Sequence, residues 1–301
     1  MSIAHEFEYV KAGSLEEALA LLAEPVEGGS MVLAGGSDLI AWLRDGAVKP
    51  GRLVDVKGVK ELRGIRMEGK SLWIGAAVPF SELLDSALVK RVAPVLWEAA
   101  GMVASVGVRN RATPVGNICS AVPCCDSGPA LLVEGAVVCA ATPEGMRRIP
   151  AGSWFLGPRR TALPAGSVVT GLRIPAGRHA GAFAKLKRYR GEDLAQASVA
   201  VRVDAKGAWK VAYGSVAPTP IRGPKAERVL KGTKAYDEAV LDRAAEAAMG
   251  EVAPITDIRS SAEYRRRMIG VMTKRACAAA LARLKGKGPE YGLNVAEEGW
   301  E

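Results

Sequence analysis

Residues 33–38 (LAGGSD) are the first segment of the chain whose residue types could bind a ligand, and they contain two adjacent glycines, Gly35 and Gly36. Adjacent glycines let backbone N–H groups converge, and a helix is predicted to begin directly after them, so the segment can form an anion-binding turn. A glycine turn before a helix is, however, more often only a turn. Both interpretations stay open from this segment alone. The chain has no G-x-G-x-x-G, so a dinucleotide would not bind in Rossmann fashion.

A second such segment, residues 108–117 (VRNRATPVGN), is followed nine residues after Asn117 by Asp126. The Thr113 and Asn117 side chains and the Gly116 backbone can donate hydrogen bonds to phosphate or polyol oxygens. The Asp126 carboxylate can accept from a sugar or polyol hydroxyl. Two such segments could hold one ligand between them. The alternative is a well-bonded loop in which Asp126 caps a helix.

A third segment, residues 64–71 (GIRMEGKS), satisfies the phosphate-loop pattern G-x-x-x-x-G-K-S. A phosphate loop joins a strand to a helix whose N-terminus holds the phosphates. Here the residues after Ser71 alternate as in a strand. The context predicts a β-hairpin that turns at residues 68–70, and it does not favour an ATPase or a GTPase.

Composition excludes several classes of protein. The chain has 301 residues, 49% of them apolar and 24% charged, which is ordinary for a globular protein of about two domains. No stretch approaches the roughly eighteen apolar residues of a membrane span. Two histidines, His5 and His179, are too few for a multi-histidine metal site and leave little scope for a Ser-His-Asp triad. The start lacks the features of a secretory signal, so we expect a cytoplasmic protein with reduced thiols.

The net charge of +9, from 41 Lys and Arg against 32 Asp and Glu, raises the question of an acidic partner. The basic residues are spread along the chain, and aromatic residues, at 5%, are too few for a base-stacking platform. We therefore expect no nucleic-acid partner. A partner subunit or the phosphates of a cofactor can use the charge instead.

Short strands and helices that alternate in the first third of the chain must position these segments. Ser14 and Glu17 have capping-box spacing and predict a helix that ends near Pro25. A strand at 31–34, the glycine turn and a helix capped by Ser37 follow. The pattern then predicts a strand near 53–56, the hairpin at 65–74 and a helix from Pro79.

Regular periodicity disappears between about residues 103 and 129, although the sequence stays apolar, and a loop of this length is usually functional. A helix is predicted again over 126–132 and a strand over 136–140. Three strands at 182–189, 196–204 and 208–216 then precede helices near 223–231, 235–249 and 260–285. Strands followed by helices indicate a separate α+β domain.

Four segments in chain order, residues 33–38, 108–117, 126–132 and 257–265, together resemble a known family. They are similar to the FAD-binding subunits of the molybdenum hydroxylases, which include the flavoprotein subunit of carbon monoxide dehydrogenase and the flavin domain of xanthine dehydrogenase. The resemblance extends over roughly residues 5–285.

The resemblance implies an α+β fold in two domains. Residues 1–176 would form an FAD-binding domain of the vanillyl-alcohol-oxidase type, with lobes at about 1–56 and 57–176. A C-terminal flavoprotein domain with a three-stranded sheet and helices would follow over 177–288. Residues 289–301 would be a loose tail.

The resemblance also implies which residues contact FAD. The backbone amides of residues 34–38 would hold the pyrophosphate, and Asp126 would meet ribityl or ribose hydroxyls. Lys185 corresponds to a lysine of the family, although by itself it would be interpreted as a solvent-facing strand lysine. No catalytic side chain and no metal ligand is expected in this chain. The expected cofactor-binding residues are Leu33, Ala34, Gly35, Gly36, Ser37, Asp38, Thr113, Val115, Gly116, Asn117, Asp126, Val169 and Lys185.

Val115 departs from the family pattern, which has glycine at this position. β-branched residues resist a positive φ, so either the backbone there is not left-handed or the loop is reshaped, with weaker FAD binding. Cys119, Cys124 and Cys125 crowd the same region. Small apolar packing beside the flavin is the favoured interpretation, while an iron–sulfur role and a reactive thiol stay open.

By this resemblance, the chain transfers electrons through FAD between iron–sulfur clusters and an acceptor such as NAD or a quinone. The expected partners are a large subunit with the molybdenum cofactor and a small subunit with two-iron, two-sulfur clusters, in a dimer of heterotrimers. Two alternatives stay open: a stand-alone FAD oxidase of the vanillyl-alcohol-oxidase type, and a phosphate-loop protein that uses residues 64–71.

Overall fold

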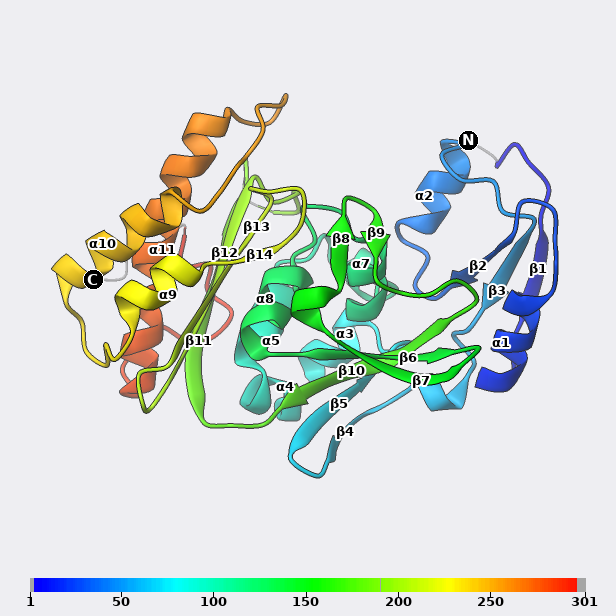
Figure 1. The fold of residues 1–301 in the computed structure, drawn as a ribbon, viewed down its shortest axis with the longest axis horizontal. Coiled ribbons are helices and arrows are strands. Elements are labelled where there is room, and N and C mark those ends of the chain that lie inside the picture. Colours follow the sequence, from blue (N-terminus) through cyan, green and yellow to red (C-terminus); the bar gives the residue numbers. More distant parts are fainter. Residues whose placement is uncertain (1–2, 190, 297–301) are drawn as a thin grey trace.

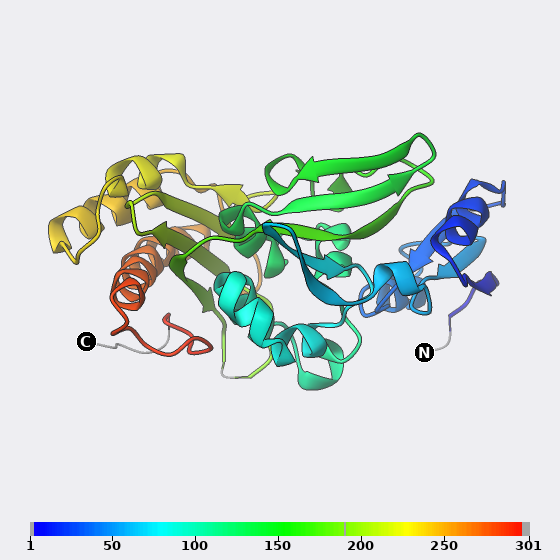
Figure 2. The same cartoon turned by 90° about the horizontal axis from the view of Figure 1, so that it is seen from below.

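The computed structural model describes residues 3–189 and 191–296. They form an N-terminal lobe, a middle lobe and a C-terminal unit, which follow one another along the longest axis (Figure 1). The view at right angles shows the N-terminal lobe and the C-terminal unit at opposite ends (Figure 2). The mixture of helices with three larger sheets confirms the expected α+β fold.

The N-terminal lobe is a small parallel sheet in the order β1-β3-β2, with β3 in the centre. Local signals begin and end its first helix as predicted: the Ser14 hydroxyl accepts from the Glu17 N–H at 3.1 Å, and the helix ends two residues before Pro25. The chain passes from β2 through the glycine turn into α2. The elements are β1 (Glu8–Lys11), α1 (Leu15–Ala23), β2 (Ser30–Leu33), α2 (Leu39–Arg44) and β3 (Arg52–Asp55).

The middle lobe is built on an antiparallel sheet in the order β4-β5-β10-β6-β7. Helices α3 to α8 and the small hairpin β8–β9 surround it (Figure 1). Its strands are β4 (Ile65–Glu68), β5 (Ser71–Gly75), β6 (Val137–Thr142), β7 (Gly145–Pro150), β8 (Phe155–Gly157), β9 (Arg160–Thr161) and β10 (Val168–Pro175). Its helices are α3 (Phe80–Asp85), α4 (Ala87–Val92), α5 (Pro94–Gly101), α6 (Val106–Arg109), α7 (Pro114–Ser120) and α8 (Ser127–Glu134), with short 3-10 turns at Lys60–Leu62 and Ala151–Ser153.

The phosphate-loop pattern at residues 64–71 lies in the β4–β5 hairpin, as predicted. Glu68 pairs with Ser71 across the turn, and Gly69 supplies the left-handed residue, at φ 59°. The residue after Ser71 continues a strand rather than a helix. The segment therefore lacks the helix N-terminus that a phosphate loop needs.

The prediction of a long irregular loop over residues 103–129 is wrong. The segment contains α6 and α7, and α8 begins at Ser127. Helices of four and seven residues are too short for a periodic pattern to emerge from the sequence. They begin instead with local caps, because the Ser105 and Thr113 hydroxyls accept backbone N–H groups three residues ahead.

The C-terminal unit has its sheet in the order β11-β12-β13-β14, covered by α9 and α11 on one face and by α5 and α8 on the other, and α10 packs on α9 and α11 (Figure 1). The three predicted strands and three predicted helices are present, and the additional strand β14 has only two residues. The elements are β11 (His179–Leu186), β12 (Ala197–Asp204), β13 (Trp209–Gly214), β14 (Ile221–Arg222), α9 (Pro224–Leu230), α10 (Glu238–Met249) and α11 (Ala262–Leu284).

The tail expected to be loose from residue 289 is packed as far as residue 296. Val295 is 1% and Ala296 8% exposed, and the Gly292 N–H donates to Glu98 Oε1 at 3.2 Å. The expectation failed because a short polar tail gains its order from tertiary contacts, which no local pattern in the sequence reveals. The last five residues of that expectation, 297–301, lie outside the described part.

Candidate functional site

A cavity of about 620 Å³ opens where the N-terminal lobe, the middle lobe and the end of β11 meet. Twelve of the thirteen expected binding residues line it: Ala34, Gly35, Gly36, Ser37, Asp38, Thr113, Val115, Gly116, Asn117, Asp126, Val169 and Lys185. Leu33 does not line it. That side chain packs in the core of the N-terminal lobe with Leu39, Leu43 and Leu53, since β2 alternates its faces.

The glycine turn enters the cavity with unpaired backbone donors. The N–H groups of residues 35–38 have no acceptor among the described residues. Gly36 has φ +77°, and a Cβ on Gly35 would lie 2.2 Å from the Arg111 carbonyl oxygen. Both positions therefore require glycine, one for its conformation and one for the close approach of the α6–α7 connection. Such a turn offers a concave set of donors to an anion.

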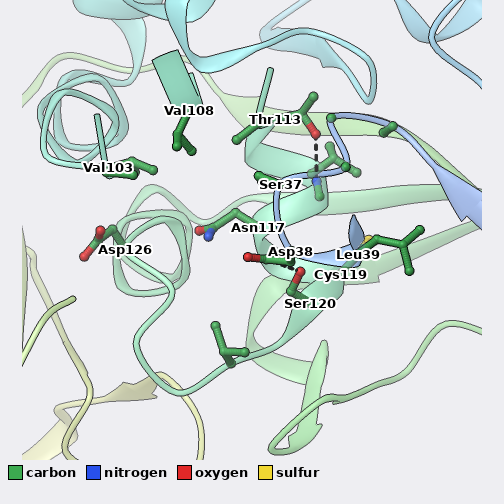
Figure 3. A pocket seen from close by; sticks show the side chains of 18 of the residues that line it. Ser37, Asp38, Leu39, Val103, Val108, Thr113, Asn117, Cys119, Ser120 and Asp126 are labelled. Atoms are coloured by element: carbon green, nitrogen blue, oxygen red, sulfur yellow. Dashed lines mark hydrogen bonds between the residues drawn. The ribbon is translucent and has the colours of Figure 1, made fainter. Parts of the chain in front are cut away.

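Asp38, not Ser37, occupies the cap position of α2, so the predicted Ser37 cap is wrong. The Asp38 carboxylate makes no capping bond either, because its Oδ2 accepts from the Ser120 hydroxyl at 2.5 Å. Figure 3 shows this contact between the glycine turn and the end of α7. Sequence analysis missed Ser120, although it lies one helical turn after Asn117 and thus on the same face of α7.

The α7 N-terminus lies beside the glycine turn and also lines the cavity (Figure 3). The Thr113 hydroxyl accepts from the Gly116 N–H at 2.8 Å, so this N–H, which we expected to serve a ligand, is already bonded within the protein. Asn117 Oδ1 accepts from the Ser127 N–H at 3.2 Å, which leaves the amide NH₂ of Asn117 to donate. Val115 is the second residue of the helix and is absent from the residues with positive φ, so the backbone there is not left-handed. The first of the two alternatives for Val115 therefore holds.

Asp126 and Lys185 form a buried ion pair in the cavity wall. Lys185 Nζ donates to Asp126 Oδ2 at 2.7 Å and to the Met102 carbonyl oxygen at 2.9 Å. Lys185 is 1% exposed, which excludes the solvent-facing interpretation. Asp126 stands at the N-cap of α8 without a capping bond, which excludes the capping alternative. Sequence analysis did not identify the Met102 carbonyl, because a backbone acceptor has no residue signature.

The ion pair does not use all of its hydrogen-bonding atoms. Asp126 Oδ1 is buried and has no hydrogen-bond partner among the described residues, and only two of the three Lys185 ammonium donors are used. Burial raises the pKa of the Asp126 carboxyl, and the charge of Lys185 partly offsets that rise. A buried acceptor without a partner is costly unless a ligand donor satisfies it.

The three cysteines of this region differ in position. Cys119 and Cys124 line the cavity, whereas Cys125 is buried behind it. Burial raises the pKa of the Cys119 thiol to about 12 and also raises the pKa values of Cys124 and Cys125. Within the described residues, no three His, Cys, Asp or Glu side chains gather in an arrangement that could hold a metal ion.

Comparison with known proteins decides the family. Residues 5–177 match the family described as the FAD binding domain in molybdopterin dehydrogenase. Residues 181–280 match the CO dehydrogenase flavoprotein C-terminal domain. The chain belongs to the FAD-binding subunits of the molybdenum hydroxylases. The resemblance found in the sequence is thus confirmed.

Two relatives in this family match over nearly their whole length. The carbon monoxide dehydrogenase medium chain of Hydrogenophaga pseudoflava is 36% identical over 283 residues, which cover 92% of this chain and 98% of the relative. The xanthine dehydrogenase FAD-binding subunit of Escherichia coli O157:H7 is 31% identical, with 93% and 97% covered.

Solved structures agree with this family. The carbon monoxide dehydrogenase structure from Hydrogenophaga pseudoflava has a TM-score of 0.88 at 36% identity, covering 94% of this chain and 99% of that one. Quinoline 2-oxidoreductase from Pseudomonas putida 86 also gives 0.88, at 27% identity and the same coverage.

The cavity fits the cofactor that this family binds. Unpaired N–H groups at the glycine turn suit a pyrophosphate, and the unpartnered Asp126 Oδ1 suits a hydroxyl donor of a ribityl or ribose group. In the described part of the chain, no helix combines the length and apolar character that crossing a membrane requires.

Proposed function

We propose that this chain is the FAD-binding electron-transfer subunit of a heteromeric molybdenum hydroxylase. The observation that supports this most directly is the buried Asp126 Oδ1, which lacks a protein partner in a cavity that also holds the unpaired amides of the glycine turn. A polyol and a diphosphate are the groups that satisfy both sets of atoms, and FAD contains both. Relatives that match almost end to end are named as medium chains or FAD-binding subunits.

Each wall of the cavity has its own task in this proposal. The amides of residues 35–38 would hold the pyrophosphate, while Asn117, Asp126 and Lys185 would bind polyol or sugar oxygens. Val169, 6% exposed at the start of β10, would pack against the cofactor. Thr113 would act mainly by shaping the start of α7. Leu33, which lies outside the cavity, would support the turn from the core.

Bound FAD would transfer electrons one or two at a time, which suits it to link iron–sulfur clusters to an acceptor such as NAD or a quinone. The protein's part is to bind the cofactor, to orient it and to restrict water around it. No acid, base or nucleophile of this chain is needed to break a substrate bond. The molybdenum cofactor and two-iron, two-sulfur clusters belong to partner subunits in this proposal.

The finer organisation follows from the same proposal. Residues 1–176 would form the FAD-binding domain and residues 177–288 the C-terminal flavoprotein domain. The partners would be a large molybdenum subunit and a small iron–sulfur subunit, assembled as a dimer of heterotrimers in the cytoplasm. The surplus of basic residues would face these partners or the FAD phosphates.

Two measurements test the proposal. The purified chain is titrated with FAD, and binding is followed by the flavin absorption bands and by quenching of flavin fluorescence. A tagged chain is then isolated from its native host, and its partners are identified together with their molybdenum and iron content. Saturable FAD binding and recovery of both partner subunits are expected. A chain that binds FAD but recovers neither subunit would instead be a stand-alone flavoprotein, and a chain that binds no FAD would refute the site.

A further inference from the structure

The segment after α11, residues 287–296, folds back across the C-terminal unit, and we call it the C-terminal arm. It is held at several points: Arg283 donates to the Pro289 and Glu290 carbonyl oxygens at 2.9 and 3.0 Å, and its guanidinium lies 4.0 Å from the centre of the Tyr291 ring. The Tyr291 hydroxyl accepts from the Gly181 N–H of β11 at 3.2 Å. The arm therefore lies along the strand that carries Lys185.

Asn294 pairs with the backbone of Lys185 through two hydrogen bonds. The Lys185 N–H donates to Asn294 Oδ1 at 3.0 Å, and Asn294 Nδ2 donates to the Lys185 carbonyl oxygen at 2.8 Å. β11 is an edge strand of its sheet and pairs with β12 on its other side. The side-chain amide thus takes the place that a neighbouring strand would occupy and fixes the backbone of one residue from the open edge.

The residue fixed in this way is the one whose ammonium enters the cofactor cavity. Lys185 Nζ lies within 2.9 Å of both Asp126 Oδ2 and the Met102 carbonyl oxygen, so a shift of the Lys185 backbone would change the geometry of both contacts. Asn294 itself does not line the cavity. A second anchor of the arm is the bond from the Gly292 N–H to Glu98 Oε1, at 3.2 Å.

We propose that Asn294 is a positioning residue for the cofactor: the C-terminal arm sets the backbone of Lys185, and through it the Asp126–Lys185 pair that receives FAD. The proposal rests on the proposed function, because it assumes that this cavity binds FAD. The match to the family model ends at residue 280, so the C-terminal arm lies beyond it. By this proposal the arm also determines cofactor affinity.

The test uses the full-length chain and the variants Asn294→Asp and Asn294→Ala. Aspartate keeps the shape and the acceptor but loses the donor to the Lys185 carbonyl oxygen, so it removes one of the two bonds with little change in packing. Each variant is expected to raise the dissociation constant of FAD by about fivefold to twentyfold, measured by fluorescence quenching far below the melting temperature. Leu293→Ala, which changes the exposed neighbouring residue, is the matched control and should leave the constant unchanged.

A double-mutant cycle separates positioning from a general loss of stability. If Asn294 acts through Lys185, Asn294→Asp should weaken FAD binding in the wild-type background but by less than about twofold when Lys185 is already methionine. Equal effects in both backgrounds would overturn the proposal, as would unchanged FAD affinity in both Asn294 variants. Two other results would instead refute the proposed function: failure of the wild-type chain to bind FAD, or an FAD affinity that Lys185→Met leaves unchanged.

Discussion

The Lys185 ammonium lies 2.7 Å from Asp126 Oδ2, and this contact joins the first strand of the C-terminal unit to the start of α8 in the middle lobe. Both side chains are at least nine-tenths buried. A buried ion pair of this kind contributes little stability by itself, since desolvation offsets the attraction. The pair matters here because it leaves Asp126 Oδ1 without a hydrogen-bond partner in the described part of the protein, so that this oxygen can accept a hydrogen bond from a ligand.

Asp126→Ala should reduce FAD occupancy of the purified chain. The substitution removes the acceptor proposed for a ribityl or ribose hydroxyl, and we expect a loss of affinity of about tenfold or more. It also leaves Lys185 without its carboxylate, which should destabilise the fold by about 3 kcal/mol. The ratio of flavin to protein absorbance reports occupancy, and a urea titration reports stability.

The double variant Asp126→Ala, Lys185→Met separates these two effects. It removes the uncompensated charge, so much of the stability should return while FAD affinity stays low. Full flavin occupancy in Asp126→Ala would show that the assignment of this wall to the cofactor is wrong.

Lys185→Met should destabilise the protein more as the pH rises. Burial already raises the pKa of Asp126, and removal of the offsetting cation raises it further. A carboxyl whose folded pKa exceeds its unfolded value gives its full contribution to stability below the unfolded pKa and loses it as the pH rises through the folded pKa. The melting temperature, measured without FAD from acid to mildly alkaline pH, should therefore fall progressively behind that of the wild type. Lys206→Met, at an exposed lysine, is the control, and a deficit independent of pH would contradict the prediction.

Gly36→Val and Gly35→Ala should each lower FAD affinity. Valine at φ +77° is strained by about 1–3 kcal/mol, and a Cβ at position 35 would collide with the Arg111 carbonyl oxygen. Either change displaces the amides proposed for the pyrophosphate. Gly58→Ala is a matched control, since a Cβ there meets no atom within 4 Å. FAD titrations in which the two turn variants bind as tightly as the control would exclude the turn from the site.

Local signals in the sequence predicted the elements that local chemistry determines. The Ser14–Glu17 spacing located α1, and the alternation on either side of Gly69 located the β4–β5 hairpin. The two glycines of the turn after β2 were identified because their conformational freedom is a property of the residue itself. The resemblance then placed twelve of the thirteen expected residues around one cavity.

Contacts between residues distant in the chain escaped prediction. Ser120 and Asp38 are separated by 82 positions, and Asn294 and Lys185 by 109, so neither pair leaves a local pattern. The use of the Gly116 N–H was missed for a different reason. Thr113 begins a helix too short to be recognised, and its cap occupies a donor that appeared free.

Alkylation of the cysteines should be slow in the native chain and sensitive to FAD at one of them. With its pKa raised to about 12, Cys119 is about one part in ten thousand thiolate at pH 8, and the thiolate is the reactive form. Iodoacetamide labelling followed by mass spectrometry should therefore be far slower at Cys119 in the native chain than in urea. Cys124, half-buried in the cavity wall, should be protected further when FAD is added. Cys139 is buried outside the cavity and should not respond to FAD, whereas labelling of Cys119 at the unfolded rate would indicate an activated thiol and revive the redox interpretation.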